Sequence, residues 1–129
     1  MSNGLNDLRF YQMSMEIWDC CWKDTELMMN DIRGREIVKQ LIRSVGSVSA
    51  NIEEGYGRGK GKEYPHFLRI ARGSANESAG WYIKSKFLLN QEVVKERTEK
   101  LNAISAMITK TIETLNKKKG KGTETETGT

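Results

Sequence analysis

Apolar side chains recur at helical spacing in four separate segments, and this pattern restricts the fold more than any other feature of the chain. Steps of three and four residues bring side chains onto one face of an α-helix, which is typically the buried face. A single proline and few β-branched clusters also favour helix over strand. The four apolar sets are Leu8, Tyr11, Met15, Trp18 and Trp22; Ile37, Leu41, Val45, Val48 and Ile52; Phe67, Ile70, Trp81 and Leu88; and Val94, Leu101, Ile104, Ile108 and Leu115.

Cap signals and turn formers mark the boundaries of four helices. Asp7 precedes the first apolar set and is a candidate N-cap. Gly55 follows the second set, where a glycine favours a left-handed C-terminal cap. Pro65 lies near the start of the third helix, where its missing N–H costs little. The predicted helices cover about residues 7–29, 35–54, 63–89 and 92–116.

Length and composition agree with one small helical domain. The chain has 129 residues, enough to bury a modest core, and 29% of them carry mixed charges. Four helices with short connections predict an all-α fold, an antiparallel up-down-up-down four-helix bundle formed by residues 1–116. Residues 117–129 are charged and of low complexity, so we expect a disordered tail there.

The third predicted helix carries two faces, one bulky and one small. Ala71, Ala75 and Ala79 form the small face, and two buried faces are typical of a central helix or a subunit contact. Gly73 and Gly80 each cost about 1 kcal/mol relative to alanine inside a helix, so we expect close packing to compensate. The second helix also has small residues that let another backbone approach, namely Ser44, Gly46, Ser47, Ser49 and Ala50.

Several features point to a cytoplasmic protein without a metal site. No run of 18 apolar residues is present, so no membrane span is expected. The N-terminus lacks a basic region followed by an apolar stretch, so no secretory signal is expected. Cys20 and Cys21 are adjacent, a spacing that suits neither a bridge within a helix nor a metal site.

The stretch "NIEEGYGRGKGKEYPHF", residues 51–67, resembles a phosphate-binding loop at first sight. The P-loop pattern G-x-x-x-x-G-K-[ST] is absent, because Lys62 is followed by Glu63. The dinucleotide pattern G-x-G-x-x-G is also absent, because residue 60 is lysine and the preceding segment is predicted as helix. The glycines therefore predict a helix connection first.

Basic residues in and after this stretch are candidates for a nucleic-acid interface. Lysine and arginine contact phosphates as point charges or as forks, and the chain carries a net charge of +4. Tyr56 and His66 are candidates for stacking on unpaired bases. The alternative is a solvated loop whose glycines serve flexibility. The candidate phosphate contacts are Arg58, Lys60, Lys62, Arg69 and Arg72.

The sequence offers no catalytic constellation. His66 is the only histidine, and no serine or cysteine near it is in a nucleophile setting. The carboxylates lack the Glu-x-x-His motifs of di-iron bundles. Glu77 lies among small residues in the third helix, and Arg43 in the second is its candidate partner. We therefore expect a protein that is not an enzyme and binds no cofactor or metal.

Two motifs resemble the four helix bundle protein family, also described as the intervening-sequence-encoded S23 ribosomal protein family. The motifs are "QLIRSVGSVSANIEEGYGR" and "FLRIARGSANE", and the resemblance covers about residues 8–116. Members are bacterial, and many are encoded within intervening sequences of 23S rRNA genes. Ile42, Ser49, Glu53 and Ala75 depart from the family pattern.

The resemblance implies an antiparallel four-helix bundle assembled into a homo-oligomeric ring, with a pentamer favoured. A related fold is the accessory protein of diversity-generating retroelements, which binds nucleic acid and a reverse transcriptase. Most members have no established activity. The polar residues that the resemblance carries over, here assigned structural roles, are Arg43, Asn51, Glu54 and Glu77, together with Arg58.

Charge and resemblance together predict a non-enzymatic, homo-oligomeric bundle that binds RNA or DNA through a basic surface. The alternative is a protein-interaction scaffold without affinity for nucleic acid, in which the small-residue faces carry the function.

Overall fold

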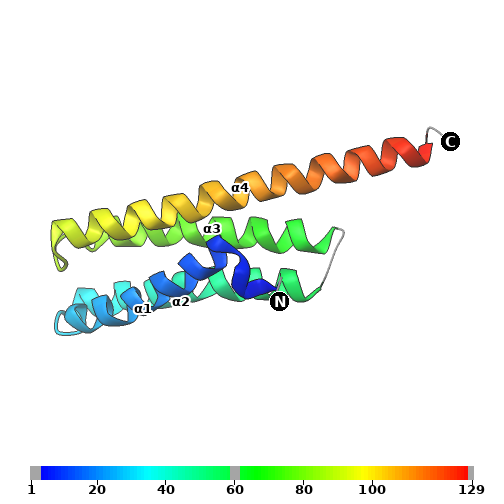
Figure 1. The fold of residues 1–129 in the computed structure, drawn as a ribbon. Coiled ribbons are helices and arrows are strands. Elements are labelled where there is room, and N and C mark those ends of the chain that lie inside the picture. Colours follow the sequence, from blue (N-terminus) through cyan, green and yellow to red (C-terminus); the bar gives the residue numbers. More distant parts are fainter. Residues whose placement is uncertain (1–3, 59–61, 128–129) are drawn as a thin grey trace.

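The computed structural model describes residues 4–58 and 62–127, and these form an all-α bundle. Each helix packs against the next one along the chain, and α4 also packs against α1. Successive helices run in opposite directions (Figure 1). Because α1 and α3 each pack against α2 and α4, they occupy opposite corners of the bundle. The predicted all-α four-helix fold is confirmed, and the oligomeric ring stays a prediction. The elements are a 3₁₀ turn, η1 (Leu5–Asp7), and the helices α1 (Arg9–Met28), α2 (Ile32–Gly57), α3 (Glu63–Lys84) and α4 (Gln91–Thr127).

The apolar sets predicted for α2 and α4 form the centre of the core. Leu41, Val45, Val48 and Ile52 of α2 are fully buried, whereas Ile37 is only partly buried. In α4 the fully buried residues are Leu101, Ile104 and Ile108. Helical periodicity therefore identified the inner faces of these two helices.

The apolar set predicted for α1 is not the core face of that helix. Trp22 is 59% exposed and Met15 is 39% exposed, while Trp18 is half-buried. The buried stripe lies on another side of the helix. It contains the polar residues Ser14, Asp24 and Thr25, so a search for apolar residues at helical spacing does not find it. Its apolar members are Phe10, Met13, Ile17, Cys21 and Met28, next to Tyr11.

The small face of α3, and not its bulky face, lies in the core. Ala71 and Ala75 are fully buried, whereas Phe67 and Trp81 are half-buried and Ile70 is exposed. The expected close packing at the two helix glycines is absent within the described part of the chain. A Cβ added to Gly73 or Gly80 would meet nothing within 4 Å.

Small residues do allow close packing between α2 and α3. Ser78 donates a hydrogen bond to Ser44 over 2.8 Å, and Ser74 donates one to Ser47 over 2.9 Å. At one end of this interface Gly55 is buried inside α2, where an added Cβ would lie 2.8 Å from the Cβ of Phe67. The predicted left-handed cap at Gly55 is therefore wrong, because α2 continues to Gly57 and glycine is needed there for space.

The caps of the first two helices also differ from expectation. Leu8 holds the N-cap position of α1, while Asp7 belongs to the preceding 3₁₀ turn. Asp31 caps α2 by accepting hydrogen bonds from the backbone N–H groups of Arg33 and Gly34. The hydrogen bond from the Arg33 side chain lowers the pKa of Asp31 to about 2, so the capping carboxylate stays charged far into the acid range.

The last two helices end at other positions than predicted. α3 ends at Lys84 and not near residue 89, because from Ser85 on the backbone N–H groups form tight turns, such as Ser85 to the carbonyl of Tyr82 and Lys86 to that of Ile83. α4 continues to Thr127 through the segment predicted as a disordered tail, and its last turns project beyond the other helices (Figure 1). Extension of an existing helix needs no new nucleus, and lysine favours helix. Residues 128–129 of that tail lie outside the described residues.

Replacement of Gly55 by alanine tests the close packing of α2 and α3. Although alanine has the higher helix propensity, the added Cβ would collide with Phe67 and Tyr64. We expect Gly55→Ala to lower the free energy of unfolding by about 1–3 kcal/mol in a urea titration. The matched control is Gly73→Ala, which enters open space and should raise stability by about 0.5–1 kcal/mol. Equal effects of the two substitutions would contradict the packing argument.

Candidate nucleic-acid interface

Arg58 follows α2 directly and is held within the chain by two carboxylates. Its guanidinium lies 2.9 Å from Glu54 and 3.6 Å from Glu63, and it also covers the ring of Phe67 at 5.6 Å. These contacts join the end of α2 to the start of α3. The positive charge of Arg58 is therefore already balanced by the carboxylates of Glu54 and Glu63.

Lys62 lies at the N-cap position of α3 and is exposed. In the described part of the chain it forms no ion pair, so its charge faces solvent. The N-terminus is the positive end of a helix dipole, and the ammonium group of Lys62 adds a further positive charge there. Together they favour the binding of an anion at the start of α3. Lys60, the predicted neighbour of Lys62 in the interface, lies outside the described residues.

Arg69 and Arg72 extend this basic edge along α3. Arg69 is exposed and has no hydrogen bond or ion pair among the described residues. Arg72 is half-buried and donates a hydrogen bond to Thr109 of α4 over 3.1 Å. Lys62 and Arg69 are seven residues apart, which is two helical turns, and Arg72 lies about one turn further. The structure thus brings three of the five predicted residues together on α3; we call Lys62, Arg69 and Arg72 the basic edge.

The two predicted stacking side chains differ in accessibility. His66 is exposed on α3, with its ring 5.2 Å from that of Phe67 in an edge-on arrangement. Tyr56 is half-buried and packs edge-on against Tyr64 at 6.1 Å. Of the two predicted stacking residues, His66 is therefore the exposed one.

The polar residues carried over from the family resemblance form short-range contacts along α2 and one exposed ion pair between α2 and α3. Asn51 is half-buried and bonds to the carbonyl and hydroxyl oxygens of Ser47. Glu54 pairs with Arg58. The predicted partner of Glu77, Arg43, lies 3.9 Å away, and both side chains are largely exposed. Glu77 is therefore a surface glutamate, which also accepts a hydrogen bond from Trp81.

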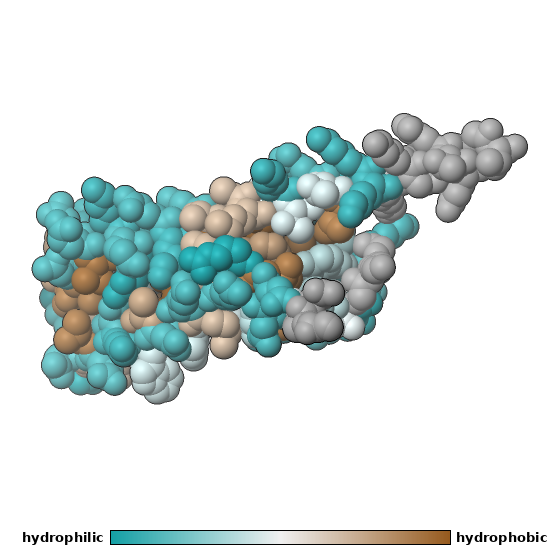
Figure 2. Space-filling model, in the orientation of Figure 1, coloured by the Kyte–Doolittle hydropathy of each residue, from teal (hydrophilic) through white to brown (hydrophobic). Residues whose placement is uncertain are grey.

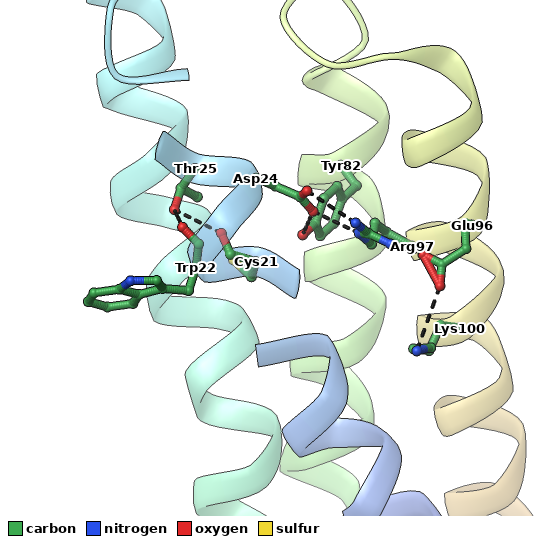
Figure 3. Close-up of polar contacts among 8 residues, drawn as sticks. All are labelled: Cys21, Trp22, Asp24, Thr25, Tyr82, Glu96, Arg97 and Lys100. Carbon is green, nitrogen blue, oxygen red and sulfur yellow. Dashed lines mark hydrogen bonds and ion pairs between the residues drawn. The ribbon is translucent and has the colours of Figure 1, made fainter. Parts of the chain in front are cut away.

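One polar cluster was missed by the sequence reasoning. Asp24 of α1 is buried, accepts a hydrogen bond of 2.7 Å from Tyr82 of α3, and pairs with Arg97 of α4 at 2.8 Å (Figure 3). Arg97 also contacts Glu96, which pairs with Lys100. The only signal in the sequence is that Asp24 has the helical spacing of Ile17, Cys21 and Met28. Three helices are thus tied together through one carboxylate.

Burial controls the protonation of the groups around this carboxylate. It raises the pKa of the Tyr82 phenol well above its usual range, so the hydroxyl stays protonated and donates to Asp24. Burial also raises the pKa of the Cys21 thiol to about 12, which keeps it neutral. The cluster therefore acts as a fixed connection between helices, and none of its members is poised as a nucleophile.

Within residues 4–58 and 62–118 no group of three or more His, Cys, Asp or Glu side chains is arranged to hold a metal ion. In the same part of the chain, no helix is both long and apolar enough to cross a membrane.

The fold is that of an all-α protein whose four helices pack in sequence order, and α3 carries the basic edge on its surface. Residues 6–110 match the family described as 23S rRNA-intervening sequence protein, and the chain belongs to this family. This agrees with the resemblance of the two motifs in α2 and α3. No curated protein matches the chain.

A solved structure supports the fold independently. It is a protein of unknown function from the S23 ribosomal protein family of Bacteroides thetaiotaomicron, superposing with a TM-score of 0.72. The similarity covers 80% of this chain and 97% of that chain at 22% sequence identity. At this level of identity the similarity is evidence for the fold alone.

Substitution of Asp24 tests the connection between α1, α3 and α4. Asp24→Ala leaves the buried Tyr82 hydroxyl without its acceptor and removes one of the two carboxylates that contact Arg97, which keeps Glu96. We expect the free energy of unfolding to fall by about 1–3 kcal/mol in a urea titration. Asp19→Ala is the matched control, because Asp19 is an exposed carboxylate of the same helix, and its effect should stay within about 0.5 kcal/mol. A similar loss in both variants would show that the cluster is not the cause.

Proposed function

We propose that this protein is a non-enzymatic, homo-oligomeric bundle that binds RNA or DNA through the basic edge of α3. The observation that carries the proposal is the placement of Lys62 and Arg69, two exposed cations without an acidic partner among the described residues, on one face of a rigid helix. Arg72 adds a third cation, fixed in direction by Thr109. Cations of this kind contact the phosphates of a nucleic acid, and each contact releases counterions that were condensed on that nucleic acid.

The surroundings of the basic edge support the proposal. The nearest acid in sequence, Glu63, is paired with Arg58, and Glu77 is near Arg43. The exposed imidazole of His66 offers a surface for a base. Membership of a family named after intervening sequences of 23S rRNA makes RNA the first ligand to test.

The proposal includes a cytoplasmic location and a pentameric ring, as implied by the family resemblance. It also includes a protein partner, for which the reverse transcriptase served by the related retroelement accessory fold is the model. The competing function is a protein-interaction scaffold, which is favoured by the exposed aromatic side chains Trp22 and Phe87. Under that alternative the purified protein has no affinity for nucleic acid at low salt.

Removal of two cations tests the basic edge. We expect Lys62→Ala combined with Arg69→Ala to weaken binding to single-stranded RNA, duplex RNA or DNA in a fluorescence anisotropy titration. The slope of log K against log salt should become shallower by about 0.7–0.9 for each lost phosphate contact.

The control removes the same charge elsewhere. Lys23 and Lys95 are exposed lysines of α1 and α4, so Lys23→Ala with Lys95→Ala should leave the salt slope unchanged. If the control weakened binding as much as the α3 variant, binding would depend on net charge and not on this edge. A wild-type protein that binds none of the three nucleic acids at low salt would refute the nucleic-acid function.

A further inference from the structure

The net positive charge of the chain is located at one end of the bundle. The start of α3 and residues 109–118 of α4 lie side by side there (Figure 1). Residues 62–72 and 109–118 together contain six lysines and arginines and two glutamates, a net charge of +4. The whole chain has the same net charge, from 21 bases and 17 acids, which leaves 15 bases and 15 acids for all other residues. The excess of positive charge therefore belongs to this end.

A second row of cations, on α4, accompanies the basic edge of α3. Thr109 faces α3, since it accepts the hydrogen bond from Arg72, whereas Ile108 is buried in the core. Lys110 and Lys117 are each about 80–100° around the helix from Thr109, on the side away from Ile108. Both lysines are exposed, and neither forms an ion pair among the described residues. We call Lys110 and Lys117 the α4 row.

The α4 row and the basic edge run along neighbouring helices with the same spacing. Lys110 and Lys117 are seven residues apart, as are Lys62 and Arg69, so each pair spans two helical turns, about 10 Å. Packed helices have axes about 8–10 Å apart, and α3 and α4 are antiparallel. Because Arg72 contacts the residue before Lys110, that lysine is level with Arg72, and Lys117 is level with the start of α3.

This charged end lacks the apolar side chains that would insert into a membrane. Anionic lipids attract cations, but stable binding to a membrane surface also needs buried apolar area. Phe87 and Ile32 are the most exposed large apolar residues of the described chain, at 85% and 76%, and both lie at the opposite end of the bundle. Figure 2 shows apolar surface at that opposite end and hydrophilic side chains on the part of α4 next to the grey segment. Charge without apolar area favours a polyanion such as a nucleic acid.

Two rows of cations match a ligand with two phosphate backbones. A single strand presents one backbone, and proteins commonly hold it by stacking its bases on aromatic rings. Residues 109–118 of α4 contain no aromatic side chain, and at the start of α3 Tyr64 and Phe67 are half-buried, which leaves His66 exposed. A run of unpaired bases would therefore find one ring to stack on. The two backbones of a duplex need only the cations.

The surface between the two rows carries groups that form hydrogen bonds, one of them acidic. Glu113 and Asn116 are exposed and lie within about 40° of Thr109 around α4, on the side that faces α3. A carboxylate accepts hydrogen bonds and repels phosphate, so Glu113 suits a ribose 2′-hydroxyl and opposes a ligand without one. The wide, shallow minor groove of an RNA duplex displays 2′-hydroxyls between its two backbones, whereas DNA has none.

We infer that the ligand of this surface is double-stranded RNA, whose minor groove lies across the α3–α4 pair. The basic edge contacts the phosphates of one strand and the α4 row contacts those of the other. Glu113 and Asn116 face the 2′-hydroxyls between the strands. The inference rests on the proposed function, and it adds the second row of contacts, the duplex form of the ligand and the preference for RNA.

Removal of the α4 row tests the second set of phosphate contacts. We expect Lys110→Ala combined with Lys117→Ala to weaken binding to a short blunt-ended RNA duplex in a fluorescence anisotropy titration. The slope of log K against log salt should become shallower by about 0.7–0.9 per lost contact, which at about 0.1 M salt is a loss of affinity of about five- to eightfold for each contact. Binding to single-stranded RNA should change much less, because one backbone needs only the basic edge.

Two control variants keep the charge or remove it elsewhere. Lys110→Arg combined with Lys117→Arg retains both cations and should bind the RNA duplex like the wild type. Lys84→Ala combined with Lys86→Ala removes two exposed lysines at the opposite end and should leave the affinity and the salt slope unchanged. All four lysines are exposed, so circular dichroism should show wild-type melting in each variant. If the Lys84 and Lys86 variant lost as much affinity as the α4 row variant, net charge would explain binding and the inference would be wrong.

Replacement of Glu113 tests the preference for RNA. Glu113→Gln removes the charge that repels phosphate and the acceptor that a 2′-hydroxyl favours. We expect binding to a DNA duplex of the same sequence to gain relative to the RNA duplex, so that the ratio of the two affinities falls by about fivefold or more. An unchanged ratio would refute the role of Glu113 in discrimination.

Three further outcomes separate this inference from the proposed function. If the α4 row variant bound duplex RNA like the wild type while the Lys62 and Arg69 variant did not, the second row would be refuted and the proposed function would stand. If the wild type bound single-stranded RNA or phosphatidylserine vesicles more tightly than duplex RNA, the duplex ligand would be refuted. A wild type that binds no nucleic acid at low salt would refute both.

Discussion

Close approach of α2 to α3 is the constraint on which the other contacts of the bundle depend. Gly55 lets the backbone of α2 reach Phe67 and Tyr64, and paired serines bridge the same interface further along. A hydrogen bond between buried hydroxyls adds only about 0.5–1.5 kcal/mol, but side chains of this size keep the helix axes close. The Arg58 contacts to Glu54 and Glu63 then join the end of α2 to the start of α3. With this pair in place, α1 and α4 cover the remaining sides of the core.

The buried Asp24 carboxylate determines how α1 is oriented on this pair. Tyr82 and Arg97 approach it from α3 and α4, so a rotation of α1 would separate a buried charge from both donors. This orientation turns Ile17, Cys21 and Met28 inward and leaves Trp22 outside. The exposure of Trp22 is therefore a consequence of satisfying one buried charge.

The two halves of α3 differ in the chemistry of their outer surfaces. The first half carries the basic edge, in which Lys62 and Arg69 face solvent and Arg72 is half-buried. The second half carries the glycines and apolar side chains beside Lys84 and Lys86, which have no carboxylate partner among the described residues. Phosphate contacts need charge and access, whereas a protein contact needs close approach and apolar area.

The sequence by itself determined the number of helices, the inner faces of α2 and α4, and the proximity of Arg43 to Glu77, because these follow from local spacing and from the family motifs. It also placed Lys62, Arg69 and Arg72 within one short segment. Only the tertiary structure decided which face of α1 is buried, since two stripes of helical spacing compete there. It also decided that Arg58 is neutralised by two acids and that Asp24 is satisfied. Tyr82 and Arg97, the partners of Asp24, are 58 and 73 residues away in the sequence. The burial of Asp24 depends on these two side chains, and a local sequence pattern contains no information on them.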